Sequence, residues 1–217
     1  MSQSGHFHRI SDATIREKHM SKSFGFAALA LGLALAPASA WAQGWRLECL
    51  ATDTVCERAT AYVLSNVKPI FAEAVVVDAI NAQNTANAKL TNIQINTMDN
   101  GWSDRSDKKL IDEKMNNPLS AYLRQKKDAG NGTIFEIFVF DNHGLNVGQT
   151  NLTQDFNQGD EAKYWKMFGT ASDATFVDKV SQDGGKNVSQ VSVTIKDPKT
   201  GKSIGAATIG IDVDKLK

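Results

Sequence analysis

The feature that most constrains the fold is a dense apolar run, Ile134–Phe140, followed at once by a turn sequence. Such a run is typical of a strand buried on both faces. The next residues, Asp141-Asn142-His143-Gly144, favour a turn because Asn, Asp and Gly tolerate positive φ angles. Residues 145–150 then alternate as a returning strand would. The sequence therefore predicts a strand, a tight turn and a returning strand, around which the rest of the chain is organised.

The residues after this hairpin predict a loop and a short helix that could cover a ligand, followed by further β-strands. A polar loop, 151–159, precedes a short amphipathic helix expected over Asp160–Phe168. Three further strands are expected, one opening at Thr175 and ending near Gln182, the others over Val188–Lys196 and Ile204–Val213. Turn sequences separate them. The expected sheet is therefore an antiparallel meander of about five strands.

The residues before the sheet predict a helical half of the chain. Apolar residues at spacings of 4, 3, 4 and 3 mark one face of a helix over 54–90, and Pro69 should kink or split it. Residues Thr91–Asp99 are compatible with either a strand or a helix. Asn100-Gly101 should interrupt the regular secondary structure. A charged helix is expected over Asp104–Lys114. Asn117 as N-cap and Pro118 at the first position should start another helix, which ends at Gly130-Asn131-Gly132.

The N-terminal residues have the order of regions found in a secretory signal peptide. An apolar run of 13 residues, Phe24–Ala36, follows Lys22 and precedes a small-residue segment. We expect the signal peptide to be cleaved after Ala40 or Ala42. Met20 is an alternative initiator methionine. The alternative to cleavage is that the apolar segment is retained as a membrane anchor. Cleavage would remove residues 1–42. The remainder, 43–217, is expected to be one α+β domain in the periplasm or outside the cell, with a helical half (43–132) and a sheet half (133–217).

Export changes the interpretation of the two cysteines, Cys49 and Cys56. On one continuous helix they would lie about 10 Å apart, too far for a bridge. An oxidising compartment favours a disulfide, which requires a loop or a helix start at Asp53-Thr54. Two free thiols are the alternative. Neither cysteine belongs to a redox or zinc motif.

Charge and histidine content exclude several functions. The 24 basic and 24 acidic side chains balance, so there is no basic footprint for nucleic acid. Only His143 follows the expected cleavage site, and no serine-hydrolase elbow or phosphate loop accompanies it. A hydrolase is therefore disfavoured, and we expect no enzyme, no cofactor and no metal centre.

Acidic and aromatic residues in and near the loop are the candidate ligand contacts. Asp155 has no local structural duty, and a carboxylate beside aromatic walls suits an amine or a hydroxylated molecule. Asp160 is expected to cap the following helix, with a metal site as the alternative. The candidate walls are Trp102, Phe156, Tyr164 and Trp165, although each could be core, and Arg105 could pair with a ligand carboxylate or form a surface salt bridge.

Several ordered segments resemble the single-Cache, PAS-like family of extracytoplasmic sensors. The resemblance is carried by residues 117–123, 138–150, 158–163, 189–193 and 204–213. It implies a long N-terminal helix packed on a curved antiparallel sheet, with a ligand pocket between the sheet and the segment 155–165. The ligand-contact set expected with it is Trp102, Arg105, Asp141, Asp155, Phe156, Gln158, Asp160, Tyr164 and Trp165.

The resemblance also implies ligand sensing without catalysis. The expected ligand is an amine, an amino acid or a carboxylate. Many members of the family are fused to a membrane anchor and a signalling domain, whereas this sequence ends at Lys217. We therefore expect this chain to present its ligand to a separate membrane sensor. The alternative is a structural or interaction protein that dimerises or docks through its N-terminal helix and binds no ligand.

Overall fold

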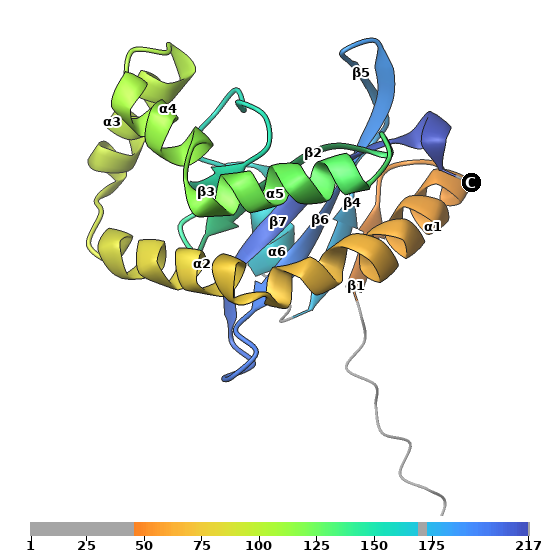
Figure 1. Ribbon diagram of the computed structural model, residues 1–217, viewed down its shortest axis with the longest axis horizontal. Coiled ribbons are helices and arrows are strands. Elements are labelled where there is room, and N and C mark those ends of the chain that lie inside the picture. The colour runs from red at the N-terminus through yellow and green to blue at the C-terminus, as the bar shows by residue number, and fades with distance from the viewer. Residues whose placement is uncertain (1–45, 169–172, 217) are drawn as a thin grey trace, which may run out of the picture. The chain divides into compact units, whose positions relative to one another are not determined.

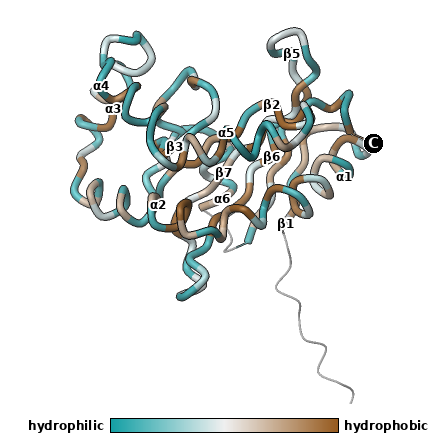
Figure 2. The backbone as a smooth tube through the Cα atoms, in the orientation of Figure 1, coloured by the Kyte–Doolittle hydropathy of each residue, from teal (hydrophilic) through white to brown (hydrophobic). Residues whose placement is uncertain are grey.

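The computed structural model describes residues 46–168 and 173–216, and the predicted signal peptide lies outside them. Helices α1, α2 and α5 form a layer in front of a twisted sheet, and α6 lies behind it (Figure 1). The protein is therefore α+β, as the sequence predicts. Figure 2 shows the most hydrophobic stretches in the central strands and in the helices beside them.

The sheet has seven strands in the described part of the chain, in the order β1-β4-β6-β7-β2-β3, with β5 paired to β6. Their bounds are β1 Arg46–Cys49, β2 Ile134–Asp141, β3 Asn146–Gln149, β4 Ala174–Val177, β5 Ser181–Asp183, β6 Lys186–Lys196 and β7 Ser203–Asp212. All pairs are antiparallel except β1 with β4, which is parallel. The prediction of five purely antiparallel strands was therefore wrong.

Two local features explain the additional strands. The segment predicted as one strand from Thr175 to about Gln182 divides into β4 and β5, because regular pairing with β6 stops after the Asp178 amide, which donates to the Gln190 carbonyl at 2.8 Å. There the Asp178 carbonyl accepts a hydrogen bond from the Ser189 hydroxyl, and the Asp178 carboxylate accepts one from the Lys179 amide. The other addition, β1, is only four residues long, too short for an alternation pattern to reveal it.

The two faces of the sheet bury different residues. One face packs Val139, Val193 and Ile209 against side chains of α1, α2 and α5 and of the segment between α1 and α2. The opposite face packs Phe138, Phe140 and Phe176 against Met167 of α6 (Ala162–Phe168). β2 is thus buried on both faces from Ile137 onward, as its apolar run predicts.

The predicted helix over 54–90 is present but interrupted. It consists of α1 (Asp53–Tyr62), a π-helical turn (Val63–Val67), a 3-10 turn (Lys68–Ala72) and α2 (Ala74–Asn87). Pro69 lies in the 3-10 turn, and Glu73 is extended at φ −68° and ψ 144°. The predicted interruption near Pro69 is confirmed, since proline cannot donate the hydrogen bond that a continuous helix needs.

Three shorter helices complete the helical half, α3 (Asn92–Ser103), α4 (Lys108–Met115) and α5 (Pro118–Ala129). The ambiguous segment after Thr91 is helical because Thr91 and Gln94 form a capping box. The break predicted at Asn100-Gly101 was wrong. A Cβ on Gly101 would lie 3.0 Å from Asp107 Cβ, so this glycine allows close approach to the start of α4. Asn117 caps α5 as predicted, accepting from the Ser120 amide at 2.8 Å.

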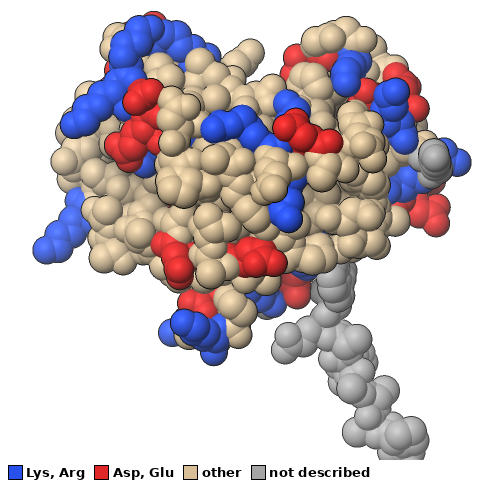
Figure 3. Space-filling view, in the orientation of Figure 1, with Lys and Arg blue, Asp and Glu red and all other residues tan. Residues whose placement is uncertain are grey.

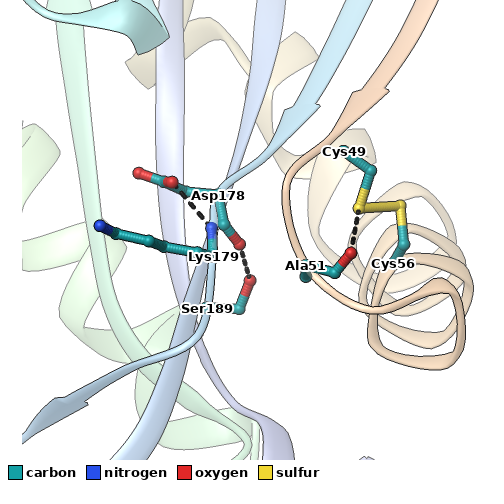
Figure 4. The surroundings of a disulfide bond; sticks show 6 residues. All are labelled: Cys49, Ala51, Cys56, Asp178, Lys179 and Ser189. Carbon is teal, nitrogen blue, oxygen red and sulfur yellow. Dashed lines mark hydrogen bonds between the residues drawn. A yellow bond between two sulfur atoms is a disulfide. The ribbon is translucent and has the colours of Figure 1, made fainter.

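The predicted disulfide between Cys49 and Cys56 is present, with the two Cα atoms 6.1 Å apart. Cys49 ends β1 and Cys56 lies in the first turns of α1, which begins at Asp53 (Figure 4). The helix start at Asp53 therefore turns the chain enough to bring the sulfurs together. The bridge fastens the edge strand β1 to the helical layer.

Charged side chains do not segregate by sign on the face that α2 and α5 cover. Figure 3 shows Lys and Arg mixed with Asp and Glu around an uncharged middle. This agrees with the balanced composition of the sequence. No helix in the described ranges has the length and apolar character needed to cross a membrane.

Candidate ligand site

A cavity of about 400 Å³ lies on the sheet face opposite α2 and α5. Its lining comes from β2, β5, β6, the loop before α6, and α6 itself. The lining residues are Glu136, Phe138, Leu152, Thr153, Gln154, Asp155, Gln158, Glu161, Lys163, Asp183 and Gln190. The volume lies within the usual range for small-molecule sites. This is the place, between sheet and covering loop, where the resemblance put a pocket.

The floor of the cavity holds a carboxylate on strand β2, which lies between β7 and the edge strand β3. Gln190 Nε2 on β6 donates a 2.9 Å hydrogen bond to Glu136 Oε1. Burial raises the pKa of Glu136, and the Gln190 hydrogen bond and the charge of Lys163 oppose this only in part. The neighbouring strand provides the room, since a Cβ on Gly210 would lie 2.7 Å from Glu136 Cγ. A glycine at this register position is therefore needed to accommodate Glu136.

The lysine of the cavity is almost completely buried. Lys163 on α6 is 9% exposed, and its Nζ lies 2.9 Å from Glu161 Oε2. The same ammonium group lies 5.0 Å from the centroid of the Phe138 ring. Ion pairing and the cation–π contact together offset part of the cost of removing this charge from water. The cavity thus brings charges of both signs to an aromatic wall.

The loop that covers the cavity is held by buried amides and a carboxylate. Asn146 Nδ2 on β3 donates to Thr153 Oγ1 at 2.9 Å and to the Asp155 carbonyl at 3.1 Å. Asp99 Oδ1 on α3 accepts from the amides of Phe156 and Asn157, both at 2.8 Å. The covering loop is therefore tied to both the sheet and the helical half.

Two of the predicted contact residues, Asp155 and Gln158, line this cavity. Two others lie behind the loop in the core, because Trp102 and Phe156 are fully buried with ring centroids 5.3 Å apart. Trp102 Nε1 donates to the Thr153 carbonyl at 3.0 Å, which anchors the loop from within. Arg105 does not line the cavity; its guanidinium donates to the Trp102 carbonyl at 3.0 Å.

The remaining predicted contacts lie away from the cavity. Asp141 is fully buried and accepts hydrogen bonds from side chains of α2 and from backbone amides of its own turn. Tyr164 donates its hydroxyl to the Asn142 carbonyl at 2.8 Å, and burial, with the charge of Asp141, raises the pKa of Tyr164. Trp165 is 57% exposed and does not line the cavity, so the structure places it neither in the core nor at this site.

Asp160 is exposed, and the expectation that it caps the next helix was wrong, because α6 begins only at Ala162. Among the described residues no group of three or more His, Cys, Asp or Glu could hold a metal ion.

Sequence reasoning missed the residues that shape the cavity floor. Glu136, Phe138, Lys163 and Gln190 are separated by up to 54 positions in the sequence. One signal was present, because Glu136 is the only charged residue within the apolar run Ile134–Phe140. A charge at an expected core position indicates either a paired group or a site.

Three solved structures resemble this chain. They are the sensor domain of DcuS from E. coli (10% identity, TM-score 0.48, covering 76% of this chain and 96% of that one), the sensor domain of the histidine kinase DctB from V. cholerae (14%, 0.42, 76% and 54%), and an extracellular ligand-binding receptor from Desulfohalobium retbaense (11%, 0.34, 65% and 25%). This chain thus spans about half of the DctB domain and a quarter of the receptor. No protein-family model and no curated protein matches the sequence.

By their descriptions these structures are sensor domains and a ligand-binding receptor, the class of protein that the resemblance in the sequence implied. At these identities and TM-scores the likeness does not establish the ligand or the activity of this chain. The ligand chemistry is inferred from the residues that line the cavity of this chain.

Proposed function

We propose that this protein is an exported sensor module of the Cache type that binds a small molecule in the cavity between the sheet and the covering loop. The observation that carries the proposal is the pair Glu136 and Lys163, two ionisable groups that are both largely withdrawn from water beside a cavity of about 400 Å³. Withdrawing such groups from water costs free energy, and a carboxyl group whose pKa is raised by burial in a cleft, as that of Glu136 is, is characteristic of functional sites.

A hydrogen-bonded path from the cavity to the N-terminal helices supports a signalling role. Lys163 lies on α6 next to Tyr164, whose hydroxyl donates to the Asn142 carbonyl at 2.8 Å. The amide of Asn142 in turn donates to Asn84 Oδ1 on α2 at 3.0 Å. A ligand that moves α6 would thereby change a contact of α2. We propose that the α2 side of the molecule reports occupancy to a separate membrane sensor.

Thermal melting against a broad panel of amines, amino acids, carboxylates, purines and divalent cations tests ligand binding. A ligand at 100 times its dissociation constant should add about 2.7 kcal/mol to the free energy of unfolding. The matched variants are Asp155→Ala, which alters the cavity lining, and Asp160→Ala, which alters an exposed residue outside it. A stabilising compound should lose affinity in the first variant and retain it in the second.

If no compound in the panel raises the melting temperature, the proposal is contradicted. That result would favour an interaction protein that docks through its N-terminal helix. The partner is tested separately, by affinity capture from membranes with and without the stabilising compound. Capture of the same membrane sensor irrespective of the compound would argue against ligand-dependent presentation.

A further inference from the structure

We propose that the cavity takes a small organic cation bearing an ammonium group. This inference rests on the proposed function and specifies the chemistry of its ligand. It follows from three features of the cavity, namely the signs of its charges, the direction of its hydrogen bonds and its aromatic wall.

Carboxylates outnumber cations in the lining. Glu136, Asp155, Glu161 and Asp183 face a single lysine, Lys163, and these residues come from β2, the covering loop, β5 and α6 with the residue preceding it. Lys163 is already paired with Glu161 at 2.9 Å. Within residues 46–168 and 173–216, no lysine or arginine forms an ion pair with Glu136, Asp155 or Asp183. A bound cation would supply the missing countercharge.

Three nitrogen groups of the lining already donate to oxygen atoms of the protein. Gln190 Nε2 donates to Glu136 at 2.9 Å, Gln158 Nε2 donates to the Asp155 carbonyl at 3.0 Å, and the Lys163 ammonium is held by Glu161. The acceptors are not used to the same extent. Gln158 is 2% exposed, and no donor among the described residues bonds its Oε1. The ionised carboxylates of the lining and the Gln158 Oε1 atom accept hydrogen bonds only, and an ammonium group brings three donors and no acceptor.

The wall of the cavity already accommodates one ammonium group. The Lys163 Nζ atom lies 5.0 Å from the centroid of the Phe138 ring and beside a carboxylate. Aromatic faces attract cations through their quadrupole, and the attraction is larger where water is displaced. A ligand carboxylate would instead enter a lining with four carboxylates and one lysine, and like charges repel at short range. The lining therefore selects against dicarboxylates.

Three four-carbon compounds of similar length and different charge test the inference directly. They are 1,4-diaminobutane, butane-1,4-diol and succinate, each titrated into the purified protein while thermal unfolding is followed. We expect a concentration-dependent rise in Tm with the diamine alone, and a smaller rise in high salt because ions screen the attraction. An equal or larger rise with the diol or succinate would overturn the cation inference and leave the proposed function standing. If neither these three compounds nor any compound of the broad panel raises Tm, both the cation inference and the proposed function are overturned.

Two charge-neutralising variants locate the bound cation. Glu136→Gln keeps the size of the side chain, and Asp183→Asn alters an exposed hairpin residue, so at least the second should fold normally. Loss of a hydrogen bond to a charged group should weaken binding of the diamine about 10-fold or more in Glu136→Gln. The matched control is Glu57→Gln, which lies on α1 outside the cavity and should bind as the unmodified protein does. Unchanged affinity in both cavity variants would overturn the assignment.

Discussion

Gln83 on α2 donates a 3.0 Å hydrogen bond to the buried carboxylate of Asp141 at the end of β2. Asn87 donates to the same oxygen at 2.9 Å, while the amides of His143 and Leu145 donate to the other oxygen at 2.8 and 2.9 Å. A buried anion is stable when its lone pairs are satisfied in this way. Asp141 therefore joins the helical layer to the β2–β3 hairpin and is a structural residue.

The substitution Asp141→Asn should destabilise the fold strongly. Asparagine would turn an NH₂ group toward two existing donors, so the expected loss is about 2–3 kcal/mol in the free energy of unfolding. Urea unfolding monitored by circular dichroism measures it. The control, Asp128→Asn, alters an exposed carboxylate on α5 and should change stability by less than about 0.5 kcal/mol. Equal effects of the two substitutions would refute this role of Asp141.

Removal of the Cys49–Cys56 bridge should loosen one edge of the sheet. The bridge closes a short loop, for which the chain-entropy model gives about 2–3 kcal/mol. The double substitution Cys49→Ser with Cys56→Ser should therefore lower Tm. It should also speed hydrogen exchange at the Leu50 amide, which donates to the Val177 carbonyl at 2.8 Å. Unchanged exchange at Leu50 would mean that β1 is held without the bridge.

Gly144 permits a close approach between the hairpin turn and the end of the covering loop. A Cβ on Gly144 would lie 2.5 Å from the Cα of Gly159, and the residue has φ of 84°. Gly132 has a similar φ of 81° with nothing within 4 Å of its Cβ position, which makes it a matched control.

Gly132→Ala should incur only the cost of the positive φ angle, about 1–2 kcal/mol. Gly144→Ala should lose about 1–3 kcal/mol more, because backbone atoms must move apart. Chemical denaturation of the two variants side by side provides the comparison. Similar losses would show that the turn and the loop can separate at little cost.

Glu136 should make stability depend on pH. Burial raises its pKa, the Gln190 hydrogen bond and the charges of Lys163 and Lys127 oppose the shift, and the charge of Asp183 adds to it. Because the folded-state pKa lies above the unfolded value, the stability that this group contributes is present below about pH 4.5 and is lost as the pH rises through the folded pKa.

Glu136→Gln removes this titration. Relative to the unmodified protein, the variant should become more stable as the pH rises from about 4 to 8, as followed by urea unfolding across that range. Glu57→Gln serves as the reference. A constant difference in unfolding free energy between Glu136→Gln and the unmodified protein over the whole range would contradict a raised pKa.

Local sequence signals predicted the features that depend on neighbouring residues. Asn117-Pro118 indicated a helix start because capping and the fixed φ of proline act within one turn. Pro69 indicated the interruption of the first helix for the same local reason. By contrast, β1 was missed because its parallel pairing with β4 joins residues more than 100 positions apart.

The amino-acid sequence by itself determined the α+β class, the strand–turn–strand segment after Thr133, the helix start at Pro118 and the interruption near Pro69, and it favoured the bridge between Cys49 and Cys56. Hydrophobic periodicity, turn-forming residues and the distance that a short chain segment can span all depend on residues close together in the sequence. They can therefore be recognised without knowledge of the tertiary structure. Only the tertiary structure decided which polar residues face the cavity. It buried Trp102 and Phe156 as core, left Trp165 exposed, and brought Glu136 to Gln190 and Lys163 to Phe138. Strand register and the docking of α6 decide these contacts, and both depend on packing across the whole sheet.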